Sequence, residues 1–398
     1  MNNTLSVSSA LLSETESIDR ILHHVSANQL SVAVWKLPND PVRRLLISRQ
    51  PIRLKSETPL EELPPGFIFA PFDRSKESLF LRADYIFAFD EGTLKVPRSA
   101  QEIDAVAWLL QLPPPPVTPL QQASGDQARG PSSPQSKAAF LQMVTRGVDE
   151  IEKGNLEKIV PSRAKTIDLA PSFDVATAFR KLCDAYPHAL VSFVSCPETG
   201  SWLGASPETL VSVEQQRIFR TVALAGTKPY LDNIALKSVA WTQKEIEEQA
   251  LVERYVISCF KKIRVREYEE HGPKTVVAGN LLHLKSDFTV DMRAINFPQL
   301  ASVMLGLLHP TSAVCGMPLE PARAFLREHE GYDREFYAGY LGPVNIGSDI
   351  HIFVNLRCMK LQDGKAIAYA GAGVTADSTP EQEWDETEMK FNTLLNVI

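Results

Sequence analysis

Helical and strand patterns occur side by side in this sequence, which predicts a mixed α+β fold around a large core. The 398 residues are 44% hydrophobic, enough apolar surface for one large domain or two. Segments with apolar residues every three or four positions indicate amphipathic helices, and segments of alternating or clustered aromatic residues indicate half-buried strands.

Composition argues against several classes of protein. The formal net charge of −7 and the lack of a basic patch argue against a nucleic-acid or anionic-membrane binder. No apolar run approaches a membrane span, and the first residues lack a basic segment followed by a long apolar one. We therefore expect a cytoplasmic protein, either a monomer or a weak homo-oligomer. The odd number of scattered cysteines predicts reduced core residues, namely Cys183, Cys196, Cys259, Cys315 and Cys358.

The first part of the chain predicts scaffold without recognisable chemistry. Ser13 and Glu16 have capping-box spacing at the start of a helix over 13–28, and strands are expected at 30–35, 44–48, 66–72 and 85–89. From residue 112 to 137, four prolines in a row precede a mixture of Gln, Ser, Gly and Pro, which predicts a linker or exposed loop. We divide the chain into 1–111, 112–137 and 138–398.

Two charged residues lie on or beside expected strands. A helix over 140–152 is followed by a strand at 156–163, in which alternation places Lys158 on the apolar face with Leu156 and Val160. The commoner explanation for a lysine at such a position is that it lies at the edge of a sheet and that its side chain reaches solvent. Glu208 follows Ser-Pro at the start of a strand over 209–213 and is either a general acid or, more commonly, a polar turn residue.

The last helix presents an acidic pair beside glycines. Strand 366–370 runs into Gly371-Ala372-Gly373, a turn that lets the backbone approach another group closely. Thr379 is the expected N-cap, with Pro380 at the first helical position and Gln382 completing a capping box. On this helix one face carries Glu383, Glu386 and Lys390.

A second helix, expected over 234–264, carries a similar acidic pair. Glu245 and Glu248 lie three residues apart on it, and two such pairs supply carboxylate oxygens of the kind that Mg²⁺ takes as ligands. The simpler alternative is a solvated helix face on which Glu386 and Lys390 form an ion pair.

Two further residues have ordinary structural explanations. Arg357, in an expected strand over 350–359, shares a face with Phe353 and Asn355 and is either an ion-pair partner or a carboxylate clamp. His309 lies in a turn-rich connection and has no second histidine at ligand spacing, so we expect a structural histidine rather than a metal ligand.

Taken in order, the motifs resemble the chorismate-utilising enzymes, and their order and spacing are most similar to those of the isochorismate synthases. The resemblance covers residues 137–398 and rests on Leu156-Glu-Lys-Ile-Val, Ser206-Pro-Glu, Leu224-Ala-Gly-Thr, Lys244-Glu-x-x-Glu, Leu308-His-Pro-Thr, Asp333-Arg, Leu356-Arg, Gly371-Ala-Gly and Glu383-Trp-x-Glu-Thr-x-x-Lys390. It implies a single large α+β domain built on antiparallel sheets with helices packed outside.

The resemblance also implies roles for the candidate residues. Lys158 takes the position of the base that activates water, and Glu208 that of the acid that protonates the departing hydroxyl. Glu248, Glu383 and Glu386 match the carboxylates that hold Mg²⁺, with Glu245 in support. The implied substrate-binding residues are Ala225, Gly226, Thr227, His309, Arg357, Gly371, Ala372, Gly373 and Lys390.

Two departures from the family pattern bear on function. Family members usually carry Lys-Asp-Arg-x-Glu-His where this chain has Lys244 to Gln249, although the metal position Glu248 is kept. Relatives that attack with a lysine carry it immediately before the Gly-Thr, where this chain has Ala225. This difference disfavours an amine-forming route through lysine.

The activity implied by the resemblance is a Mg²⁺-dependent conversion of chorismate to isochorismate, by attack of water at C2 and loss of the C4 hydroxyl. A base, an acid and a cation suffice for this chemistry, without a redox cofactor. Menaquinone or siderophore biosynthesis is the expected context. Salicylate synthase, anthranilate synthase component I and a catalytically inactive chorismate-binding relative stay open as alternatives.

Overall fold

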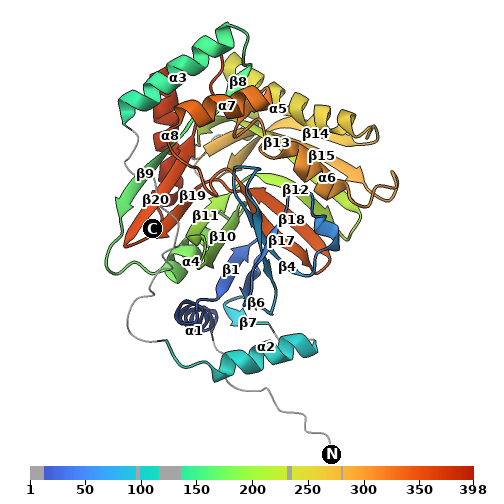
Figure 1. Ribbon diagram of the computed structural model, residues 1–398, viewed down its shortest axis with the longest axis vertical. Coiled ribbons are helices and arrows are strands. Elements are labelled where there is room, and N and C mark those ends of the chain that lie inside the picture. The colour runs from blue at the N-terminus through green and yellow to red at the C-terminus, as the bar shows by residue number, and fades with distance from the viewer. Residues whose placement is uncertain (1–12, 96–98, 116–135, 231–234, 279–280) are drawn as a thin grey trace, which may run out of the picture.

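The computed structural model describes residues 13–95, 99–115, 136–230, 235–278 and 281–398. Two nine-stranded sheets dominate it, and every strand pair among the described residues is antiparallel (Figure 1). No helix in these ranges is long and apolar enough to cross a membrane.

The first sheet takes strands from three separated parts of the chain. Its order is β7 (Thr93–Leu94), β6 (Tyr85–Asp90), β2 (Arg43–Ser48), β1 (Ser31–Lys36), β10 (Leu190–Cys196), β11 (Gly200–Ser206), β19 (Cys358–Gln362), β20 (Lys365–Gly371) and β9 (Ser162–Asp168).

The second sheet is built in the same way. Its order is β14 (Glu269–Ala278), β15 (Leu281–Asp291), β13 (Ile218–Pro229), β12 (Thr209–Glu214), β18 (Asp349–Val354), β17 (Tyr340–Ile346), β4 (Gly66–Ala70), β5 (Ser78–Arg82) and β3 (Ile52–Leu54). A small third sheet pairs β8 (Lys158–Ile159) with β16 (Gly316–Met317).

Buried side chains fall into two main clusters, because strand side chains alternate between faces. On β1, Ala33 and Trp35 join a cluster that includes residues of both sheets, while Val32 and Val34 join a second cluster under helices. The helices of the second cluster are α1 (Glu14–Ala27), α2 (Ala100–Gln111), α4 (Val175–Ala185) and α8 (Pro380–Leu395).

The remaining helices cover the second sheet and the small third sheet. Helices α5 (Gln243–Lys262) and α6 (Leu300–Leu308) contact β13 and β12, and α3 (Lys137–Glu152) packs on α8 with α7 (Leu319–His329) beside β16 (Figure 1). Short 3₁₀ turns lie at Leu60–Glu62 and Leu236–Ser238. Antiparallel sheets with helices outside confirm the predicted fold class, and all five cysteines are buried and unbridged as predicted.

The N-terminal part contributes strands to both sheets, since β1 pairs with β10 and β4 pairs with β17. Helix α2 ends at Gln111 and α3 begins at Lys137, but residues 116–135 lie outside the described ranges. The proposed division at 112–137 therefore stays a prediction.

Three expected elements differ most in their bounds from those observed. The strand expected at 156–163 breaks into β8 and β9, since Pro161 has no N–H to continue a ladder. The helix expected from residue 234 begins at Gln243, because Glu245 turns back to accept the Thr242 N–H at 2.7 Å. The strand expected at 350–359 splits where the chain crosses between the sheets, with Arg357 at φ +48°.

The start of the last helix is partly as expected. Pro380 occupies the first turn of α8, but the Thr379 side chain makes no capping hydrogen bond and Gln382 is exposed to solvent. The capping box predicted there is wrong. Residues 371–373 are likewise no tight turn, since they continue outward from β20 until Val374 bridges to Ile159.

Candidate active site

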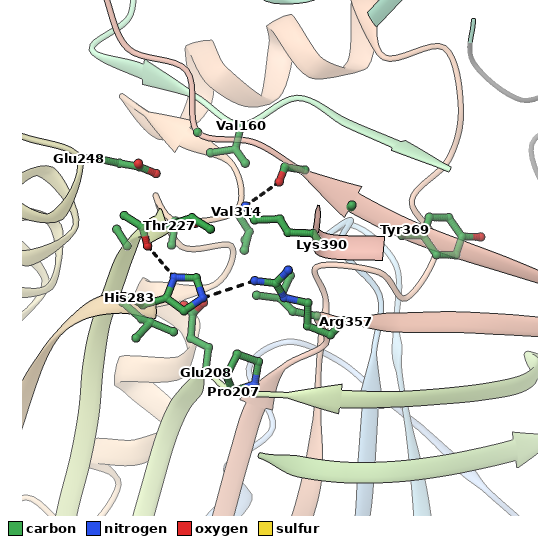
Figure 2. A pocket seen from close by; sticks show the side chains of 18 of the residues that line it. Val160, Pro207, Glu208, Thr227, Glu248, His283, Val314, Arg357, Tyr369 and Lys390 are labelled. Atoms are coloured by element: carbon green, nitrogen blue, oxygen red, sulfur yellow. Dashed lines mark hydrogen bonds between the residues drawn. The ribbon is translucent and has the colours of Figure 1, made fainter. Parts of the chain in front are cut away.

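A cavity of about 640 Å³, including its open mouth, lies where the ends of both sheets meet α5 and α8 (Figure 2). Its walls come from the segments around β8, β12, β13, β15 and β20, from α5 and α8, and from the crossing between β18 and β19. The charged or titratable residues that line it are Glu208, Glu248, His283, Tyr337, Arg357, Tyr369 and Lys390.

Glu208 is a buried carboxylic acid in the cavity wall. It follows Pro207 between β11 and β12, and only 4% of it is exposed. Burial raises its pKa from 4.5 to about 8, although the charges of Lys158, Lys390 and Arg357 oppose this rise. The carboxyl group therefore carries a proton at pH 7, as a general acid requires. The polar-turn explanation is wrong.

Lys158 faces inward, at 0% exposure. The two-residue strand β8 is held between β16 and Val374, and the Lys158 Nζ donates to Glu248 Oε1 at 3.0 Å. An edge lysine reaching solvent is thus excluded. Lys158 is not one of the residues that line the cavity, but its partner Glu248 is.

Glycine at residue 373 makes room for this pair. A β-carbon there would overlap the Glu248 carboxylate and would lie 3.3 Å from Lys158 Cε. The prediction that the glycine segment allows close approach is confirmed, and the group that approaches is Glu248.

The carboxylates implied as metal ligands are each paired with a lysine. Glu248 pairs with Lys158 at 3.0 Å, Glu383 with Lys244 at 2.6 Å and Glu386 with Lys390 at 2.6 Å. The predicted Glu386–Lys390 pair therefore forms, but both side chains are less than one-fifth exposed rather than solvated. Within the described ranges, no three His, Cys, Asp or Glu side chains are arranged so as to hold a metal ion.

Glu383 has a buried carboxylate oxygen that would suit a cation. Its side chain is fully buried, and Oε2 has no hydrogen bond of standard geometry among the described residues, although Ser378 lies nearby. Burial and the charge of Glu386 raise the pKa of Glu383 to about 7 despite Lys244. A divalent cation would give Oε2 a partner and would lower the pKa of Glu383. Carboxylate oxygens are ligands that suit Mg²⁺.

Glu386 remains ionised beside it. Burial alone would raise the pKa of Glu386, but Lys390 and Lys244 hold it below its usual value. Glu245 is engaged in capping α5, with Lys228 at 3.9 Å, so the structure gives it no place beside the other carboxylates.

Arg357 offers a free donor for a carboxylate. It enters the cavity from the crossing between the sheets, where Asn355 Nδ2 donates to Phe336 O at 2.9 Å. Burial lowers the pKa of Arg357 to about 10, which leaves it charged at neutral pH. Its Nη1 is buried without an acceptor in the described part of the chain. The expected strand position was wrong, but Arg357 does line the cavity, and its role as a carboxylate clamp stays a prediction.

His283 is a site residue that the sequence analysis missed. Its Nδ1 donates to Gly226 O at 2.5 Å, so Nε2 is free to accept from Arg357 Nη2 at 3.4 Å (Figure 2). Burial lowers the pKa of His283 to about 3, and the ring is neutral. The only signal in the sequence was a polar residue within the apolar run of β15, which many core histidines share.

Backbone groups complete the wall. The β13 ladder shifts register between Ala225 and Lys228, and Gly226 adopts φ +67°, a conformation that favours glycine. Lys390 Nζ donates to Gly371 O at 2.8 Å, which fixes the ammonium group at the end of β20.

The structure thus brings most predicted residues together. Those that line the cavity are Glu208, Ala225, Gly226, Thr227, Glu248, Arg357, Gly371, Gly373 and Lys390. Those that do not line it are Lys158, Glu245, His309, Ala372, Glu383 and Glu386. His309 is a buried structural histidine whose Nε2 contacts Pro71 O at 3.2 Å, and burial lowers its pKa to about 3.

Comparison with known proteins accounts for this arrangement. The family model described as "Chorismate binding enzyme" matches residues 79–398. The chain belongs to the chorismate-binding enzyme family. The resemblance seen in the motifs is therefore confirmed, and it extends into the N-terminal part.

The named relatives are described as isochorismate synthases. Isochorismate synthase EntC of Escherichia coli K12 is 29% identical over 266 residues, which cover 66% of this chain and 67% of EntC. Putative isochorismate synthase MenF of Mycobacterium tuberculosis H37Rv is 31% identical over 309 residues, which cover 74% and 81%.

A solved structure shows the same fold. The putative 2,3-dihydroxybenzoate-specific isochorismate synthase DhbC from Bacillus anthracis superposes with a TM-score of 0.73 at 23% identity, covering 95% of this chain and 99% of that one. The single chorismate-binding domain of antiparallel sheets and outer helices is confirmed.

Proposed function

We propose that this protein is a Mg²⁺-dependent isochorismate synthase that converts chorismate to isochorismate. The observation that carries the proposal is a buried acid with a raised pKa, Glu208, in the cavity wall, together with a buried lysine, Lys158, that is bonded to the cavity residue Glu248. The names of the curated relatives support the same activity.

The chemistry needs an acid and a base at two ring positions. Glu208 holds the proton that the departing C4 hydroxyl requires, because loss of water is far easier than loss of hydroxide. Lys158 takes the proton from the water that attacks C2. The lysine acts as a base in its neutral form, in which one N–H can still donate to Glu248 while the lone pair accepts the water's proton.

The substrate is a dianion, and the cavity supplies cations for it. Arg357 Nη1 is the free donor for one carboxylate, with Lys390 on the same wall. Glu248, Glu383 and Glu386 would hold Mg²⁺, which would anchor and polarise the other carboxylate. The neutral His283 keeps Arg357 turned into the cavity.

Product analysis tests the proposal. Purified protein is incubated with chorismate and MgCl₂ near pH 7.5, with a matched sample in excess chelator. We expect isochorismate without stoichiometric pyruvate, a measurable reverse reaction, and no turnover in chelator. Release of pyruvate in step with chorismate loss would identify a salicylate synthase instead, and no consumption of chorismate would contradict an enzymatic role.

The pathway context is part of the same proposal. We infer that the product serves menaquinone or siderophore biosynthesis in the cytoplasm. Loss of the gene in its host should then create a growth requirement for a menaquinone or for chelated iron, and the nutrient that restores growth identifies the pathway.

A further inference from the structure

Lys244 is the lysine of the site that has no role in the chemistry above. It is the second residue of α5, and its Nζ donates to Glu383 Oε1 on α8 at 2.6 Å. The Lys244 side chain is 20% exposed and that of Glu383 is fully buried. The pair therefore joins the first turns of the two helices whose Glu248 and Lys390 line the cavity.

A lysine is poorly placed in the first turn of a helix, because the helix dipole is positive there. For Lys244, nearby carboxylates offset this unfavourable interaction. Burial alone would lower the pKa of Lys244, but Glu383, Glu386 and Glu248 together raise it. These are the same three carboxylates that fit a divalent cation, and each already has a lysine as its partner.

We propose that Lys244 is the resident counter-ion of this carboxylate group and that it weakens the binding of Mg²⁺ to the substrate-free protein. The inference rests on the proposed function, because it takes these carboxylates to be the metal ligands. The Lys244 ammonium group and a bound Mg²⁺ would repel each other near the same oxygens. A hydrogen bond from Lys244 also makes Glu383 Oε1 a weaker ligand for the metal.

The experiment compares wild-type protein with Lys244→Gln and with a matched control, Lys261→Gln. Lys261 is exposed near the other end of α5, about 25 Å away at 1.5 Å per residue. Each variant removes one positive charge from the same helix. MgCl₂ is titrated calorimetrically into each substrate-free protein at low ionic strength and at the same pH of 8.

We expect Lys244→Gln to bind Mg²⁺ roughly tenfold more tightly than wild type or better, and Lys261→Gln to stay within about twofold. Thermal unfolding gives a second readout: in chelator the Tm of Lys244→Gln falls, because Glu383 loses its partner. Mg²⁺ should raise that Tm by more than it raises the wild-type Tm.

The outcomes separate this inference from the proposed function. Equal or weaker Mg²⁺ binding by Lys244→Gln overturns the inference even where wild-type protein makes isochorismate with Mg²⁺. A similar gain in both variants also overturns it, since the effect would then be net charge alone. Full wild-type turnover in chelator, with no Mg²⁺ binding by any of the proteins, overturns both.

Discussion

Gly373 and Glu248 fit so closely that a methyl group on residue 373 would overlap the Glu248 carboxylate. The Glu248 carboxylate in turn holds the Lys158 ammonium at 3.0 Å. Gly373 therefore contacts the partner of the proposed base, and a small change at residue 373 should displace Glu248 and, through it, Lys158.

Gly373→Ala should lower turnover about 100-fold or more while the protein stays folded. The end of a flexible side chain can move away from the new methyl group, but a displacement of about 1 Å at catalytic groups is enough for such a loss. Gly306→Ala is the control, because a β-carbon there meets nothing within 4 Å. Wild-type turnover in Gly373→Ala would show that Glu248 need not stay in place.

The site could be predicted where residues are close in sequence, and less well where the fold brings them together. The face of α8 that carries Glu383, Glu386 and Lys390 follows from helical spacing, and so does the Glu386–Lys390 pair. The Lys244–Glu383 and Lys158–Glu248 pairs do not, because they need α5 placed against α8 and β8, which no local pattern specifies.

Arg357 and His283 show the same limit in another way. Arg357 was placed on a strand face, yet it reaches the cavity because the chain leaves one sheet for the other there. His283 lies in a strand whose alternation is ordinary, and only the register with β13 puts it beside Gly226. Sheet register and crossings depend on the whole chain.

Glu208 should give the enzyme an alkaline limit. Its pKa of about 8 means that the proton needed by the leaving hydroxyl is lost as pH rises through that value. We expect kcat/KM to fall about tenfold per pH unit above pH 8 to 9. A flat profile from pH 7 to 10 would remove Glu208 from the role of acid.

The same raised pKa has a consequence for stability. Between about pH 4.5 and 8 the folded protein keeps the Glu208 proton that the unfolded chain has lost. The free energy of unfolding should therefore decrease with rising pH in this window, by up to about 1.4 kcal/mol per unit. Glu208→Gln should lack this contribution, which denaturant titrations of both proteins at pH 5, 6.5 and 8 would measure.

Arg334 and Glu330 should matter for stability. Both side chains are almost completely buried, and Arg334 also donates to Val160 O and Val314 O at 2.7 Å, on the cavity wall. Arg334→Met removes the cation that balances the buried Glu330 carboxylate, and such a loss typically costs about 3–5 kcal/mol. Arg327→Met, at an exposed position of α7, should change the free energy of unfolding by less than about 0.5 kcal/mol.

The double variant Arg334→Met/Glu330→Gln sharpens this prediction. Removing both charges should restore part of the lost stability, because no unpaired ion then stays in the core. Ser162 still loses its charged acceptor, so recovery should be incomplete. Additive losses in denaturant titrations of the single and double variants would show that the two residues act independently.

Lys158 and Glu208 should behave as one catalytic unit. They act on opposite ends of a single displacement, so removing either stops the same step. Lys158→Met keeps the length of a side chain that is fully buried, and Glu208→Gln keeps the shape of the carboxyl group without its acidic proton. Each variant should lose roughly 10² to 10⁴-fold in kcat, the usual worth of positioned proton transfer.

The double variant should lose far less than the product of the two single losses. Once the base is absent, the acid has no developing hydroxyl to protonate, and such strong non-additivity is the rule for residues that act together. Isochorismate formation under saturating chorismate and MgCl₂ measures each kcat, with circular dichroism to establish that the variants fold. Losses that simply multiply would mean that Lys158 and Glu208 serve separate steps, and turnover retained in Lys158→Met would identify another base.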